Sequence, residues 1–342
     1  MTPAERHLPT GKLPPDLLQR CLAKIPRADA RVIVWPGIGE DAAVVEVGGA
    51  LLVAKTDPIT FATELIGWYA VHVNANDVAC MGASPRWFMA DLLLPGGTTP
   101  EQAEAIFDQM LEACGALGIS LIGGHSEITV GLDRPIVIGC LLGEIEDKRP
   151  ILSSGAKPGD AIIITKGIAV EGTALLAREA KERLLQAGVG EEVVERASRF
   201  LFEPGLSVVR DAEVARGAAA VTSLHDPTEG GLATGLEEVA KASGVGLEVN
   251  LDQIPILPET GQVCRALGLD PLGLLASGCL IVTVEPAESD AVVSALERAG
   301  IRARRIGTVL PAAEGLRMIE AGQKKPFRRF ERDEVARFFD AT

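Results

Sequence analysis

Hydrophobic residues recur at helical or strand spacing along most of the chain, and this pattern predicts its secondary structure. The clearest helix spans residues 99–118, because Thr99 can cap its first turn and Pro100 suits its first position. Its predicted buried face consists of residues three or four apart, namely Ala103, Ile106, Phe107, Met110 and Cys114.

Other elements of the first half follow from the same periodicities. Amphipathic or apolar stretches of helical length predict two further helices, over residues 16–25 and 63–83. Runs rich in β-branched and aliphatic residues predict strands over 41–47, 50–57, 86–95, 119–124 and 135–145. The adjacent glycines Gly48 and Gly49 predict a hairpin turn between the first two of these strands.

The pattern restarts after the turn-rich segment "SSGAKPGDA". Predicted strands occupy residues 161–165, 219–226, 245–251, 278–284 and 303–309. Predicted helices occupy residues 171–187, 191–202, 205–217, 229–244 and 287–300. Because hairpin-like neighbours are mixed with helices, the order favours an α+β, or mixed α/β, fold over an alternating parallel sheet. We expect two domains, over residues 1–152 and 153–342.

Composition narrows the class of protein. Hydrophobic residues make up 47% of the 342 residues and charged residues 23%, which is typical of a globular chain. The net charge of −14 argues against nucleic acid as a partner. The apolar runs are shorter than the roughly 20 residues that a membrane helix needs. The six cysteines show no C-x-x-C spacing, and the opening "MTPAERHLPTGKLPP" is polar. We expect a cytoplasmic protein without membrane segments.

Several segments of the first half could carry chemistry, although each also has a purely structural interpretation. Asp41 lies in the glycine-containing segment "GIGEDAAVV", where aspartate also suits a turn. Asp57 ends a predicted strand, which is a common position for ligand binding. Asn74 and Asp77 lie three residues apart on one face of a predicted helix. A carboxylate buried there needs either a hydrogen-bond donor or a cation.

Glycine pairs mark two further candidate ligand sites. Gly123 and Gly124 end a predicted strand and lead into a predicted turn with His125, where a ligand could approach the backbone closely. In "LHDPTEGGL", Gly230 and Gly231 open a predicted helix, whose free N–H groups could bind an anion. The alternative for this second site is an ordinary helix cap.

Three side chains are candidates for proton transfer. His125 follows the first glycine pair, Glu171 lies at a predicted helix start, and Asp226 precedes the second glycine pair. For Glu171 the structural alternative is a favourable interaction with the helix dipole. For Asp226 the alternative, open also to Thr228, is a helix cap.

The order of these motifs resembles one superfamily. The series "GEDAAVV", "TDP", "NANDVACMGASP", "IGGHSE", "KPGDAIIIT" and "DPTEGGL" is similar to that of the ATP-binding, AIR synthase-related proteins. This group includes aminoimidazole ribonucleotide synthetase, thiamine-monophosphate kinase, selenophosphate synthetase and HypE. The segments "TGKLPPDLLQRCL" and "DPTEGGLATGLEEVAKASGVGLEV" look most like the HypE branch.

The resemblance implies a two-domain fold and a shared site. The N-terminal domains of two subunits would pair into a β-barrel, with ATP and Mg²⁺ bound at the interface of a homodimer. Asp41, Asp57 and Asp77 would hold the metal ion and phosphates. The nucleotide would also contact two groups of residues, which are Asn74, Asn76, Gly123 and Gly124 in the first half and Thr228, Gly230 and Gly231 in the second.

The resemblance also implies an activity, with alternatives. A HypE-like enzyme would phosphorylate an oxygen of a small or protein-borne substrate and could act with a maturation-factor partner in hydrogenase maturation. The HypE branch carries a C-terminal cysteine and often an arginine at position 229, whereas this sequence ends "VARFFDAT" and has Glu229. The last cysteine is Cys279, in a predicted strand. A kinase similar to thiamine-monophosphate kinase and a non-catalytic nucleotide-binding scaffold are the alternatives.

Overall fold

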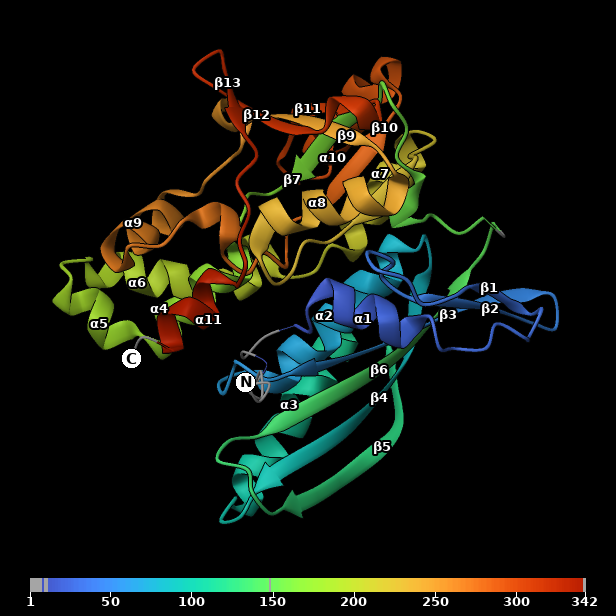
Figure 1. Ribbon diagram of the computed structural model, residues 1–342. Coiled ribbons are helices and arrows are strands. Elements are labelled where there is room, and N and C mark those ends of the chain that lie inside the picture. The colour runs from blue at the N-terminus through green and yellow to red at the C-terminus, as the bar shows by residue number, and fades with distance from the viewer. Residues whose placement is uncertain (1–7, 9–11, 148, 341–342) are drawn as a thin grey trace, which may run out of the picture.

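A computed structural model describes residue 8 and residues 12–147 and 149–340, which form two mixed α/β halves (Figure 1). Each half is built around one sheet, and the sheets are separated in sequence by residues 146–160. The expected domain boundary at residues 152 and 153 falls in this connecting segment and stays a prediction. The part of the chain that the structure describes contains no helix that is both long and apolar enough to cross a membrane.

The first sheet has six strands in the order β1-β2-β3-β6-β4-β5. Neighbouring strands are antiparallel except for β4 and β5, which are parallel. The strands are β1 (Val32–Val34), β2 (Ala43–Val47), β3 (Ala50–Ile59), β4 (Ser84–Pro95), β5 (Ser120–Thr129) and β6 (Ile136–Ile145). Strand β5 forms one edge of this sheet, at the bottom of Figure 1.

Three helices belong to the first half, namely α1 (Pro15–Leu22), α2 (Ile66–Cys80) and α3 (Pro100–Leu117). Every residue of α2 is buried, because the helix packs against the first sheet, α3 and elements of the second half. Glycine allows this helix to approach the sheet, since a Cβ atom added at Gly139 of β6 would lie 2.3 Å from Nδ2 of Asn74. The third helix begins with the predicted capping box of Thr99 and Gln102.

The second sheet has seven strands in the order β13-β12-β9-β11-β7-β10-β8. The strands are β7 (Ala161–Thr165), β8 (Ser223–His225), β9 (Gly246–Asn250), β10 (Ile281–Val284), β11 (Ala303–Leu310), β12 (Leu316–Glu320) and β13 (Gln323–Pro326). The run "AIIIT" is buried on both faces of the sheet. Ile162 and Ile164 pack in the cluster that contains α8, whereas Ile163 packs in the cluster that contains α7 and α10.

Eight helices surround this sheet and extend beside it (Figure 1). They are α4 (Val170–Glu179), α5 (Lys181–Gln186), α6 (Glu191–Ser198), α7 (Val209–Ala218), α8 (Gly231–Ser243), α9 (Pro258–Leu267), α10 (Ser289–Arg298) and α11 (Glu334–Asp340). Helices α4, α5, α6 and α9 pack on one another, and α11 lies beside them in Figure 1. This helical group therefore forms a layer of its own, next to the first half.

The two halves are joined through the segment that precedes α7. The side-chain amide of Asn76, on α2, donates to the carbonyl of Leu206 at 3.0 Å and accepts from the N–H of Val208 at 2.8 Å. From the other side, the ammonium of Lys166 donates to the carbonyl of Ser207. Helix α2 is thus hydrogen-bonded directly to the second half.

The predicted α+β, two-domain fold is confirmed, but several predicted elements need correction. The predicted helix 171–187 is two helices, because the backbone at Ala180 leaves the helical region with φ −123° and ψ 24°. The predicted strand 119–124 continues to Thr129, so the glycine pair does not form a turn. Phe107, predicted to be buried, is 40% exposed. The chain also forms β1, α9, β12, β13 and α11, which were not predicted from the sequence.

Candidate active site

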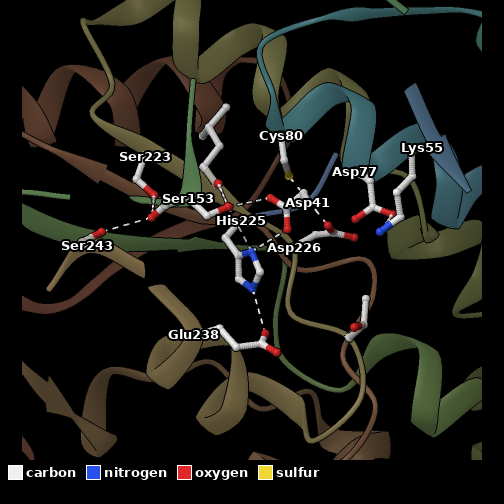
Figure 2. Close-up of polar contacts among 12 residues, drawn as sticks. Asp41, Lys55, Asp77, Cys80, Ser153, Ser223, His225, Asp226, Glu238 and Ser243 are labelled. Carbon is white, nitrogen blue, oxygen red and sulfur yellow. Dashed lines mark hydrogen bonds and ion pairs between the residues drawn. The ribbon is translucent and has the colours of Figure 1, made fainter. Parts of the chain in front are cut away.

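Three buried carboxylates from both halves meet at one point (Figure 2). One oxygen from each of Asp41, Asp77 and Asp226 lies within 4.8 Å of the other two. Asp41 lies in the loop before β2, Asp77 in the last turn of α2, and Asp226 directly after β8. The cluster therefore forms only when the two halves pack together.

His225 connects this cluster to helix α8 (Figure 2). Its Nδ1 lies 2.8 Å from Oδ1 of Asp41, and its Nε2 lies 3.1 Å from Oε2 of Glu238. Burial alone would lower the pKa of His225, but the two carboxylates raise it well above the usual value. The imidazolium therefore balances two acids. The hydroxyl of Ser153 donates to the other oxygen of Asp41 at 2.8 Å, which fixes that carboxylate further.

Lys55 neutralises the opposite side of the cluster. Its Nζ lies 3.1 Å from Oδ2 of Asp77 and 3.4 Å from Oδ2 of Asp57. Burial would lower the pKa of Lys55, but these two carboxylates raise it. Lys55 and Asp57 are two residues apart on β3 and so lie on the same face of the strand. Asp57 stands next to the three clustered carboxylates and is linked to them through this lysine.

The charge of the cluster is only partly compensated. Burial and then the charge of Asp41 raise the pKa of Asp226 to about 7, and burial raises the pKa of Asp77 well above its usual value. Oδ1 of Asp226 contacts the thiol of Cys80 at 3.7 Å, whereas its Oδ2 is buried without a hydrogen-bond partner. Converging carboxylate oxygens with an unpartnered acceptor are the donor set that Mg²⁺ prefers. These residues therefore fit a magnesium ion.

The cluster lines a cavity of about 600 Å³, a size typical of small-molecule sites. Apolar residues line another part of it, among them Phe61, Leu175 and Leu275. Glu171, in the first turn of α4, also lines this cavity. Burial raises the pKa of Glu171 to about 8, although the nearby hydroxyl of Ser277 opposes the shift. Its Oε2 is buried without a hydrogen-bond partner, so a polar ligand group could bind there.

The glycine pair before α8 is already capped. The N–H of Gly230 donates to Oδ2 of Asp333 at 2.6 Å, so a carboxylate from the C-terminal segment occupies this end of the helix. Gly231 packs against the chain before β10, because a Cβ atom there would lie 2.4 Å from the carbonyl oxygen of Leu272. Neither Asp226 nor Thr228 is the cap. Thr228 lines the cavity instead.

The structure does not bring all the predicted site residues together within one chain. Gly123, Gly124 and His125 lie on the exposed edge strand β5, where His125 contacts Glu127 at 3.3 Å. The amide of Asn74 accepts from the N–H of Asp57 at 2.9 Å and so positions that residue. The amide of Asn76 is used to join the two halves. Their roles in binding nucleotide stay predictions.

Sequence reasoning did not assign three charged residues of this site. The sequence did contain a signal for Lys55, because it lies two residues before Asp57 and therefore on the same face of the strand. His225 directly precedes the candidate Asp226, but its contacts with Asp41 and Glu238 appear only in the fold. Glu238 lies thirteen residues after its partner, within α8, and only the packing of that helix reveals the contact.

Comparison with known proteins shows the family to which this chain belongs. The model of the AIR synthase related N-terminal domain matches residues 39–145, and that of the C-terminal domain matches residues 157–318. The chain is 33% identical over 285 residues to carbamoyl dehydratase HypE of Rhizobium leguminosarum bv. viciae, covering 81% of this chain and 78% of the relative. The chain belongs to the HypE family.

Solved HypE structures share the fold. A crystal structure of E. coli HypE matches with a TM-score of 0.73 and 26% identity, over 84% of this chain and 88% of that one. A HypE crystal structure in complex with ATP matches with a TM-score of 0.68 and 26% identity, over 86% and 90% of the two chains. The resemblance noted from the motif series is therefore confirmed at the level of family and fold.

Proposed function

We propose that this HypE-family protein binds ATP with Mg²⁺ in the cavity between its halves. It would transfer the γ-phosphate to the oxygen of a carbamoyl-type amide. The observation that carries the proposal is the group of three carboxylates, one oxygen of each lying within 4.8 Å of the others, beside a cavity of about 600 Å³. The HypE relative crystallised with ATP and the relatives named carbamoyl dehydratase support the nucleotide and the acceptor class.

Phosphoryl transfer depends mainly on positioning and charge neutralisation, which this site can provide. Asp41, Asp77 and Asp226 would hold Mg²⁺, which supplies positive charge to the phosphates when bound. Lys55 and His225 would keep the carboxylates oriented through the contacts described above. Asp57 was also predicted as a metal ligand, and it would take part in binding Mg²⁺ and the phosphates from its position next to Lys55.

Glu171 is suited to proton transfer in this reaction. As the amide oxygen attacks the γ-phosphorus atom and ADP leaves, the amide nitrogen can lose a proton to the carboxylate form of Glu171. The pKa of about 8 lies near neutral pH, where a group can both accept and release a proton. Its unpartnered Oε2 provides the acceptor atom.

A homodimer formed through β5 is part of this proposal. The edge strand carries Ile122 and Ile128, which are 54% and 58% exposed, and α3 carries Phe107 and Leu111, which are 40% and 54% exposed. Exposed apolar residues beside an unpaired strand edge favour pairing with another strand. Such pairing would also give Gly123, Gly124 and His125 a partner surface.

The experiment measures ADP formation from Mg-ATP with a carbamoylated peptide as acceptor, and with thiamine monophosphate as the competing acceptor. We expect ADP formation that depends on Mg²⁺ and on the carbamoyl group, and a strong loss in Asp57→Asn. Formation of thiamine diphosphate would favour the kinase alternative. Tight ATP binding without turnover on either acceptor would favour the scaffold alternative, and equal turnover by Asp57→Asn would contradict the role of that residue.

A further inference from the structure

The acidic side chains that line the cavity outnumber its cationic side chains. Eight acidic residues line it, namely Glu40, Asp41, Asp57, Asp77, Glu171, Asp226, Glu229 and Glu238. A nucleotide triphosphate would add further negative charge. Coulomb repulsion between like charges is strong in a partly buried site, so each cationic side chain there matters for binding.

Most of the cationic groups of the cavity are already paired. Lys55 contacts two aspartates, and His225 contacts Asp41 and Glu238. Arg134, at the cavity lining, contacts its neighbour Asp133 at 3.8 Å. Lys12 differs from these groups, because the hydrogen bond that the structure gives its ammonium goes to a neutral hydroxyl.

Lys12 lies just before α1 and reaches the loop that precedes α8. Its Nζ donates to Oγ1 of Thr228 at 3.1 Å, and its backbone N–H bonds to the Glu229 carboxylate. Two residues of the second half thus hold one lysine of the N-terminal segment. Lys12 is exposed as a residue. Desolvation of its ammonium at the cavity would lower the pKa of Lys12, but the charges of Glu238, Glu229 and Asp57 raise it, which keeps the ammonium protonated.

An ammonium group has three N–H donors, and only one of them is used by Thr228. No other described residue accepts a hydrogen bond from this ammonium, so the other two donors can serve a ligand that enters the cavity. A protonated lysine with free N–H donors can form charge-assisted hydrogen bonds with a phosphate group. Lys12 lines the same cavity as the carboxylate cluster that would hold Mg²⁺ and the phosphates, so its free donors point to the phosphate end of the nucleotide.

We propose that Lys12 binds the terminal phosphate of the nucleotide, positioned for this by Thr228 and Glu229. This inference rests on the proposed ATP site and extends it to a cationic ligand from the N-terminal segment. The proposal predicts an effect of Lys12 on binding that a lysine with a purely structural role would not have. Replacing Lys12 should weaken the binding of a nucleotide with three phosphates and leave the binding of one with two phosphates nearly unchanged.

The test is calorimetric titration with a non-hydrolysable ATP analogue and with ADP, each in excess Mg²⁺. We expect Lys12→Ala to weaken binding of the ATP analogue about tenfold, or about 1.4 kcal/mol, and binding of ADP less than about twofold. Lys12→Arg should keep affinity for the analogue within about threefold, since it keeps the charge. The control is Lys24→Ala, because Lys24 is exposed just after α1 and should leave both affinities unchanged.

The outcomes separate this inference from the proposed function. If the wild type does not bind the analogue, the ATP site itself is wrong. If the wild type binds the analogue but Lys12→Ala binds it equally well, only the role of Lys12 is wrong. An equal loss of affinity for the analogue and for ADP would also overturn the inference, because it would indicate a general effect on the fold or on the electrostatic potential of the cavity. Lys12→Arg then keeps the charge hypothesis testable should the alanine variant unfold.

Discussion

Helix α2 and strand β5 both carried motifs of the predicted site, yet the fold treats them in opposite ways. Helix α2 is buried along its whole length, with neighbours from both halves, and its Asp77 meets Asp226 and Asp41. Strand β5 is exposed along most of its length and has a neighbour on one side only. A chemical motif thus becomes a site only where the fold supplies its partners, and for β5 those partners would come from another subunit.

The largest effect expected from this comparison is on turnover. Asp77→Asn should reduce Mg-ATP turnover by about 100-fold or more, because it removes a charge from the group that would hold the metal ion. His125→Ala should reduce turnover by about tenfold or less, because His125 lies outside the cavity of its own chain. Steady-state ADP formation by both variants measures the difference. An equal loss in the two variants would show that β5 contributes as much as α2.

Glycine substitutions should show how tightly β5 is fitted to its neighbour. Gly124 has φ +144°, and a Cβ atom there would lie 1.9 Å from the carbonyl oxygen of Ala90. Gly124→Ala should therefore destabilise the protein by roughly 2–4 kcal/mol in urea denaturation. Gly123→Ala is the matched control, because the space around its Cβ position is open. Similar stability of the two variants would contradict the close contact between β4 and β5.

The buried Glu171 gives an intermediate effect that depends on pH. Its pKa in the folded protein is about 8, raised by burial above the usual 4.5. The unfolded chain therefore loses this proton first, and stability decreases as pH rises from about 4.5 to about 8. Glu171→Gln should unfold at higher urea than the wild type at pH 8, by roughly 1–3 kcal/mol, and show little advantage at pH 4.5. A constant difference across this range would mean that burial does not control the carboxyl.

The smallest change in stability is expected for a substitution on β5 that should instead change the association of two subunits. Ile128→Lys should alter the free energy of unfolding of one chain by less than about 0.5 kcal/mol, because this side chain is 58% exposed. It should nevertheless shift the mass in sedimentation equilibrium towards the monomer, since a charge would lie in the proposed dimer contact. Val47→Lys, at a site that is 55% exposed on β2, should leave the mass unchanged. A wild-type protein that is already monomeric would refute the dimer.

The sequence was sufficient to predict elements with strong periodicity. The capped helix 99–118 and the buried run "AIIIT" form nearly as expected, because propensity, capping and burial agree there. The glycine pair of β5 was misinterpreted as a turn, since glycine serves both turns and close strand packing. The structure shows the second use, with a shift of register in the pairing of β4 and β5.

The site was predictable in its residue types and less so in its contacts. Asp41, Asp77 and Asp226 were all candidates, because Asp41 and Asp226 lie near glycines and Asp77 lies in an apolar helical stretch. Their assembly could not be predicted, since Asp41 is held by His225, which in turn contacts Glu238 on a helix of the second half. The cap on Gly230 comes from Asp333, 103 residues later, and no local pattern connects the two.

The double hydrogen bond between Asn76 and the segment before α7 has a consequence for cooperativity. Because Asn76 lies next to Asp77, unfolding of either half would break both the joint between the halves and the carboxylate cluster. The two sheets are thus not independent folding units, although they are separate in sequence. Heating should melt them in a single calorimetric transition, and Asn76→Ala should split that transition into two.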